Sequence, residues 1–273
     1  MTMTLHLQTV PARNGLLWIR HAFKVWQRKP LALTGLFSFS MFSALLLSLL
    51  PFGGLLLVAA LPLMSLGFML ATHLVLQDKT PSIQVFAAPF KVNSPQSRTQ
   101  LTLCAAYAAS ALVMALVLNW VDGATMDQAI RALQKEMARE KPDGDAMNAI
   151  WMEPAVLKAL GWHLLASTLL AIPFWHAPAL VHWGGQGAMQ ALFSSTLGLW
   201  RNRGAFSVNA MAWAGLIMGL SLLISGAALV LGPLLLLPLL ALVLLLPTLF
   251  YASLYFTFID CFMFGAPRDL LSK

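Results

Sequence analysis

Two long stretches of the chain contain no charged residue, one over residues 30–77 and one over residues 205–259. Each is too long for a single membrane crossing and about right for two, because a transmembrane helix needs about 20 apolar residues. Glycine and proline, which favour turns, interrupt the first stretch at residues 51–54 and the second at residues 232–233. The pattern therefore predicts two membrane-spanning helical hairpins.

Two more apolar segments bring the number of predicted spans to six. The expected ranges are 31–50, 55–76, 101–121, 159–181, 206–231 and 234–258. Several of them contain proline, which packed membrane helices tolerate. Charged residues make up 10% of the chain and hydrophobic residues 59%, whereas a soluble domain carries about 25% charged residues. We therefore expect an all-α, polytopic bundle of six transmembrane helices.

A basic, amphipathic segment precedes the first charge-free stretch. Its apolar residues share one helical face and its basic residues the opposite face. The apolar residues are Leu16, Ile19, Phe23 and Trp26, and the basic residues are Arg20, Lys24 and Arg28. A helix of this kind lies in the membrane interface rather than crossing it, and Pro30 is expected to end it.

A similar segment precedes the second charge-free stretch. With an offset of 174 residues, Trp26 aligns with Trp200 and Pro30 with Gly204. We therefore expect two parallel repeats, each a basic amphipathic helix followed by a helical hairpin, with Trp26 and Trp200 as interfacial anchors. The residues expected to contact anionic lipid headgroups are Arg20, Lys24, Arg28, Lys29, Arg201 and Arg203.

The distribution of basic residues predicts the orientation in the membrane. Twelve basic residues lie in the tails and loops on the side of the N-terminus, against five in the loop 122–158, which also holds seven acidic residues. Cytoplasmic loops carry the excess of Lys and Arg, so both termini are expected in the cytoplasm. The net charge of +7 thus belongs to the membrane flanks, and no nucleic-acid partner is expected.

The loop 122–158 is expected to form a helical cap on the periplasmic face. Met126, Ile130, Leu133 and Met137 recur at helical spacing, and a turn sequence follows at residues 141–145. A second apolar patch at residues 150–152 completes a helix–turn–helix. The same stripe fits either a cap on the membrane surface or a helix that docks a partner.

These elements divide the chain into four expected parts. Residues 1–12 are a disordered tail. Residues 13–100 hold the first repeat with a cytoplasmic loop, and residues 101–183 hold the third and fourth spans with the periplasmic loop 122–158. Residues 184–273 hold the second repeat and a short tail.

Three ionisable residues are candidates for an intramembrane polar site, because such groups within spans often serve function. His176 lies deepest, Asp260 lies near the end of the sixth span, and His73 is a candidate partner for Asp260. The competing interpretation for the histidines is hydrogen bonding between helices or at the interface. Their spacing does not match a metal site, and no catalytic motif occurs, so neither a metal nor another cofactor is expected.

Three segments carry a resemblance to known proteins, at residues 26–30, 174–181 and 253–260. With them the chain resembles an uncharacterised family of six-span inner-membrane proteins of Gram-negative, chiefly betaproteobacterial, species. It is more distantly similar to the membrane domain fused to some glycerophosphodiester phosphodiesterases. The resemblance implies topology and location, and no phosphodiesterase activity, since that domain is not part of the sequence.

The expected function is that of a non-catalytic membrane scaffold or envelope-assembly factor. Its expected partners are the anionic bilayer and either a membrane protein or a second copy, for which Gly215 and Gly219 provide a small-residue motif. The alternative is a permease or carrier for a small amphiphilic or lipid-like substrate. An enzyme is not expected, because no nucleophile–base or metal set occurs.

Overall fold

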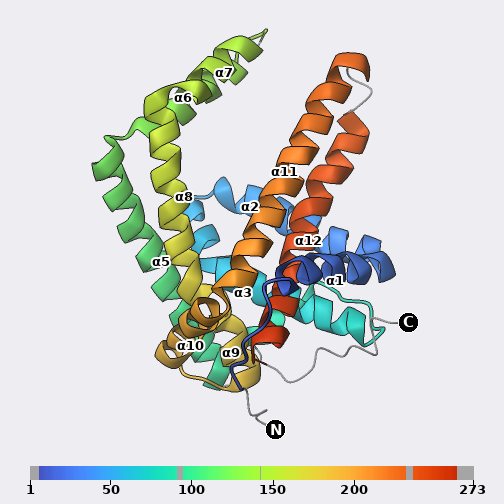
Figure 1. Cartoon of the computed structure of the whole chain (residues 1–273). Helices are drawn as coiled ribbons and strands as arrows, with labels where there is room; N and C mark the ends of the chain where they lie inside the picture. The colour runs from blue at the N-terminus through green and yellow to red at the C-terminus, as the bar shows by residue number, and fades with distance from the viewer. Residues whose placement is uncertain (1–5, 91–94, 142, 232–235, 263–273) are drawn as a thin grey trace. The chain divides into compact units, whose positions relative to one another are not determined.

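The computed structural model describes residues 6–90, 95–141, 143–231 and 236–262 of the chain. These residues form helices, turns and irregular segments, with no β-strand among them (Figure 1). Six helical segments are long and apolar enough to cross a membrane: Pro30–Ser48, Gly53–Leu76, Gln96–Asp122, Pro154–Gly184, Arg203–Ala227 and Ala241–Phe262. The prediction of an all-α membrane protein with six spans is therefore confirmed.

Five of these spans are single helices. They are α2 (Pro30–Ser48), α3 (Gly53–Leu76), α5 (Pro95–Asp122), α11 (Arg203–Leu231) and α12 (Leu236–Phe262). Proline occurs inside α3 at position 62 and inside α12 at position 247. Both helices continue through it, as packed membrane helices do.

The fourth span is interrupted, whereas one helix was expected over residues 159–181. It consists of α8 (Pro154–Phe174) and α9 (Ala177–Gly184), with Trp175 and His176 between them. Pro178 is the second residue of α9. In a continuous helix its ring would clash with the carbonyl group of Phe174, four residues earlier, which is where α8 ends.

The chain divides into two compact units. The first contains residues 1–105 and 173–273, and the second contains residues 106–172. In the first unit, α12 lies against α1 (Asn14–Arg28), α2 and α3. From residue 252 to residue 262, every residue of α12 except Asp260 is buried. The C-terminal half of α12 is thus the core of this unit.

Helix α1 packs on α11 and α12 through a narrow stripe of residues. The buried residues are Gly15, Trp18, Ala22 and Val25. They lie beside the predicted apolar stripe, of which Leu16 and Phe23 stay 55% and 41% exposed. The helix therefore has a face that packs on the protein, an apolar flank and a basic sector.

The C-terminal part of the first unit has the same order of elements as its N-terminal part. Helix α10 (Ala188–Arg201) precedes α11 and α12 as α1 precedes α2 and α3, and it begins 174 residues after α1. Two short elements, α4 (Gln84–Ala87) and η1 (Ala88–Phe90), follow α3. The duplication itself stays a prediction.

Residues 6–12 have no regular structure, but hydrogen bonds hold them. The Gln8 N–H donates to the Cys261 carbonyl oxygen at 2.8 Å, and the Val10 N–H donates to Asn202 Oδ1 at 2.8 Å. Asn202 Nδ2 in turn donates to the Gln8 carbonyl oxygen at 2.9 Å. This part of the expected disordered tail is therefore fixed to the first unit, and residues 1–5 lie outside the described residues.

The second unit joins the ends of α5 and α8 to a pair of short helices. These are α6 (Thr125–Met137) and α7 (Gly144–Met152), which agree with the expected helix–turn–helix. Met126 is buried, while Ile130 and Met137 of the same predicted stripe are 41% and 66% exposed. The position of this pair on the periplasmic membrane surface stays a prediction.

Candidate functional site around the C-terminal half of helix α12

Polar side chains leave the C-terminal half of α12 in different directions. Tyr255, Thr257 and Asp260 are separated by two and three residues, and each residue turns a helix by about 100°. They therefore point to different neighbours. The three candidate polar residues of the sequence all lie here, but each takes part in a contact of its own.

Asp260 interacts with α1. One of its carboxylate oxygens, Oδ2, accepts a hydrogen bond from Trp18 Nε1 at 2.7 Å and another from Asn14 Nδ2 at 2.9 Å. Two donors on one carboxylate oxygen form charge-assisted hydrogen bonds, which are stronger than bonds between neutral groups. Asp260 is thus an acceptor that fixes α1 on α12, and His73 is not among its hydrogen-bond donors in the described part of the chain.

His21 of α1 lies close enough to Asp260 for the charge of that residue to affect its pKa. Its ring is 5.3 Å from that of Phe256, measured between centroids. Burial lowers the pKa of His21 below its ordinary value of 6.5, and the nearby charges of Lys24 and Arg20 lower it further, while the charge of Asp260 opposes the change. The imidazole is therefore biased toward its neutral form.

His73 links α3 to α12. Its Nδ1 lies 2.8 Å from the Tyr255 hydroxyl oxygen, and its Nε2 lies 2.9 Å from Gln77 Nε2. Because the Gln77 amide nitrogen can only donate, His73 Nε2 accepts and Nδ1–H donates to Tyr255. One nitrogen of the ring thus joins α3 to α12, and the other bonds to the residue that directly follows α3.

His176 occupies the interruption between α8 and α9 and is fully buried. Its backbone N–H donates to Ser195 Oγ of α10 at 3.0 Å, and its Nε2 lies 3.1 Å from Thr257 Oγ1. The Thr257 hydroxyl donates to the Leu254 carbonyl oxygen at 2.8 Å and accepts from Trp175 Nε1 at 3.2 Å. Since its one proton is used, His176 Nε2–H must be the donor to Thr257.

This assignment leaves the other ring nitrogen of His176 as an acceptor. Nδ1 is buried and has no hydrogen-bond partner. The rings of Phe206, Phe258 and Phe262 surround the imidazole, with centroids 5.3 to 6.0 Å away. An unpaired buried acceptor costs about 1–3 kcal/mol, so His176 carries the one unsatisfied atom of this cluster that the described residues show.

The predicted lipid-contacting residues lie on α1 and around α10. Arg20 and Arg201 are exposed, and Lys29 is half-buried at the end of α1. Lys24 is also half-buried, and an Arg28 guanidinium nitrogen lies 3.9 Å from a carboxylate oxygen of Asp78. These residues surround the packed stripe of α1 or extend from the end of α10, and so remain at the surface of the first unit.

The two tryptophans expected as anchors differ in exposure. Trp26 is half-buried, and its Nε1 donates to Thr34 Oγ1 at 3.0 Å. Trp200 is 68% exposed, and the guanidinium carbon of Arg203 lies 5.4 Å from the centroid of its ring. Trp200 is therefore the freer of the two to enter a bilayer.

Several functional contacts are made by residues that the sequence patterns did not single out. Trp18 and Asn14 hold Asp260, Thr257 and Ser195 hold His176, and Asn202 holds residues 8 and 10. The sequence offered one signal for these contacts, namely the hydroxyl residues of the stretch 253–260, which carries the family resemblance. The remaining partners depend on which helices pack together.

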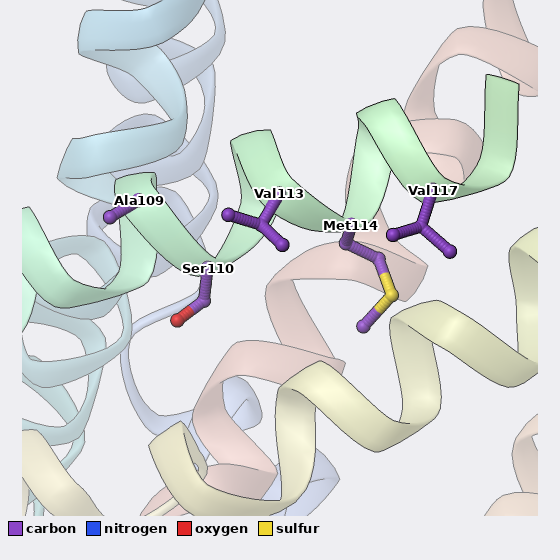
Figure 2. A pocket seen from close by; sticks show the side chains of 5 residues that line it. All are labelled: Ala109, Ser110, Val113, Met114 and Val117. Carbon is purple, nitrogen blue, oxygen red and sulfur yellow. The ribbon is translucent and has the colours of Figure 1, made fainter. Parts of the chain in front are cut away.

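Helix α5 carries an open hollow of about 360 Å³ in the second unit. Ala109, Ser110, Val113, Met114 and Val117 line it from one face of the helix (Figure 2). Its single polar side chain is a serine hydroxyl, so it presents no acid, base or metal ligand. In the described residues as a whole, no group of three His, Cys, Asp or Glu is placed to hold a metal ion.

The chain is similar to a probable inner membrane protein of Burkholderia thailandensis. The two are 28% identical over 275 residues, which cover 97% of each chain. No protein-family model matches the chain. No solved structure matches it either. The similarity agrees with the expected resemblance to inner-membrane proteins, and nothing in these comparisons concerns the phosphodiesterase-associated domain.

Proposed function

We propose that the protein is a non-catalytic scaffold or envelope-assembly factor of the bacterial inner membrane, with both termini in the cytoplasm. The proposal rests on the hydrogen bonds that the three candidate polar residues make between helices. Asp260, His73 and His176 each join one helix to α12 through hydrogen bonds. Residues used in this way stabilise an arrangement of helices and are not displayed to a substrate.

The complete burial of His176 and of its hydrogen-bond partner supports the same conclusion. His176 is 0% exposed, and Thr257, its partner, is also 0% exposed. A transporter usually presents several polar groups to a cavity near the middle of the membrane. The first unit instead uses such groups to bring α1, α3 and α9 against α12, which gives a fixed surface on which other membrane components could assemble.

The proposal is tested by native mass spectrometry of the full-length protein, gently extracted from its own membrane. We expect a stoichiometric protein partner to remain bound, and to remain bound to the His176→Ala variant if that variant keeps its fold. A second six-span protein extracted in the same way controls for unspecific carry-over. Retention of a small molecule without any protein partner would contradict the scaffold proposal.

A carrier for a small amphiphilic substrate is the second candidate, and one specific observation favours it. The fourth span is broken at Trp175 and His176, and His176 Nδ1 is an unpaired acceptor at that break. Discontinuous helices form the substrate sites of many transporters. In this case, the extracted protein should retain a small molecule that His176→Ala releases, and liposomes containing the protein should take up that molecule.

A further inference from the structure

The outward face of α10 is apolar, although this helix is too short to cross a membrane. Met189, Phe193 and Trp200 are 79%, 70% and 68% exposed. Their spacing places them on one side of the helix, opposite the buried side formed by Ala191, Ser195 and Gly198. These three large side chains form an exposed apolar patch, and such patches mark surfaces that bind a protein or a membrane.

Basic residues adjoin this patch. Arg201 is exposed at the end of α10, and Arg203, at the start of α11, lies over Trp200. Over the whole chain between Glu153 and Asp260 there is no acidic residue. The patch and its cations therefore combine an apolar surface with positive charge, the combination that binds at an anionic membrane surface.

We propose that the α10 face, formed by Met189, Phe193, Trp200, Arg201 and Arg203, is a binding surface for anionic phospholipids. The apolar side chains enter the boundary between headgroups and acyl chains, where tryptophan is favoured. The guanidinium groups bind the phosphate of the headgroup, for which their planar, forked donors are suited. The proposal holds whether the protein is a scaffold or a carrier.

Helix α1 offers a second surface of the same type. Leu16 and Phe23 form its exposed apolar flank, and Arg20 lies exposed beside them. The tryptophan next to this flank, Trp26, is half-buried and bonded to Thr34. Because the corresponding Trp200 is mostly exposed, the α10 face is expected to bind lipid more strongly than α1.

The test uses the delipidated full-length protein and native mass spectrometry with an equimolar mixture of phosphatidylglycerol and phosphatidylcholine of matched acyl chains. The wild-type protein should bind phosphatidylglycerol in preference. The Arg201→Gln/Arg203→Gln variant should lose this preference by about thirtyfold, the factor expected for two basic residues at about 1 kcal/mol each at an anionic surface. The preference should also weaken as salt is added, because exposed charges are screened.

The matched control is Arg131→Gln/Lys135→Gln, which removes the same charge from two exposed positions of α6. It should leave the preference unchanged, and an equal loss in both variants would overturn the proposal. A photoreactive p-benzoylphenylalanine in place of Phe193 then distinguishes lipid from protein in native membranes. A lipid adduct supports the proposal, and a specific protein adduct at this position overturns it.

Discussion

The indole N–H of Trp18 donates a hydrogen bond of 2.7 Å to a carboxylate oxygen of Asp260, 242 residues further along the chain. The bond joins the amphipathic helix that precedes the first hairpin to the last helix of the second. Trp18 is completely buried, and its ring also packs 5.0 Å from that of Phe206 in α11. The two ends of the chain are thereby held together in one unit.

Replacing Trp18 with phenylalanine should destabilise the protein by about 1.5–3 kcal/mol, since the bond involves a charged acceptor. Much of the ring volume is kept, so the loss reports mainly the hydrogen bond. The measurement is the midpoint of thermal unfolding in detergent, with Asp260→Asn and the double variant completing a cycle. Trp26→Phe, which loses a neutral bond to Thr34, should cost about half as much. Equal costs for the two variants would count against the special role of Asp260.

Gly15 marks the closest approach between α1 and α11. A Cβ atom at this position would lie 2.3 Å from the Ala205 carbonyl oxygen and 2.7 Å from the Asn209 backbone nitrogen. Because both are backbone atoms, Gly15→Ala must separate the helices, and we expect a loss of stability of about 1–3 kcal/mol.

The matched control for this change is Gly226→Ala in α11, where a Cβ atom meets nothing within 4 Å. Alanine favours the helix there, so this variant should keep or slightly raise the midpoint of thermal unfolding. If both alanine variants unfold at the wild-type temperature, the contact between α1 and α11 is not as close as the structure indicates.

The amphipathic helices show how far sequence periodicity reaches. Spacing identified α1 as a helix that begins near residue 13 and ends before Pro30, which matches Asn14–Arg28. It selected Leu16 and Phe23 as the apolar face, whereas the face that packs on the protein contains Gly15 and Ala22. Small residues contribute little to a hydrophobic pattern, yet they allow helices to approach closely. The spacing of hydrophobic residues therefore did not identify the face of α1 that packs on the protein.

The residues of the candidate site could be predicted from the sequence, but their hydrogen-bond partners could not. His73, His176 and Asp260 were identified because ionisable groups are rare in spans. Their partners Tyr255, Thr257 and Trp18 come from helices distant in the sequence. Such pairings depend on which helices are neighbours and on their rotation, and local spacing contains no information on either.

Thr257 is the residue on which the surroundings of His176 depend. Its hydroxyl oxygen accepts from both Trp175 Nε1 and His176 Nε2. Thr257→Val keeps the shape and removes the acceptor, so the buried N–H of His176 loses its partner at about 1–3 kcal/mol, and the half-buried Trp175 N–H loses its partner as well. Thr257→Ser keeps the hydroxyl and should retain most of the stability. Thermal unfolding of the two variants checks this, and a valine variant as stable as the serine variant would contradict the assigned network.

The stability of the folded protein should depend on pH through His21. Burial lowers the pKa of His21 below 6.5, with Lys24 and Arg20 adding to the effect and Asp260 opposing it. Between the lowered pKa and 6.5 the unfolded chain binds more protons than the folded protein, so stability rises with pH across this interval. The contribution of His21 is therefore present above pH 6.5 and is lost as the pH falls below that value.

His21→Gln removes this titration, so its midpoint of thermal unfolding should depend less on pH than that of the wild type. Measured from pH 8 to pH 5, the advantage of the wild-type protein over the variant should shrink as the solution becomes more acidic. Arg20→Gln removes a neighbouring positive charge that lowers the pKa of His21. It should therefore leave the onset of the loss near pH 6.5 and make the total loss of stability in acid smaller. An advantage that grows in acid would mean that the charge of Asp260 outweighs burial at His21, and a constant advantage would mean that the two effects cancel.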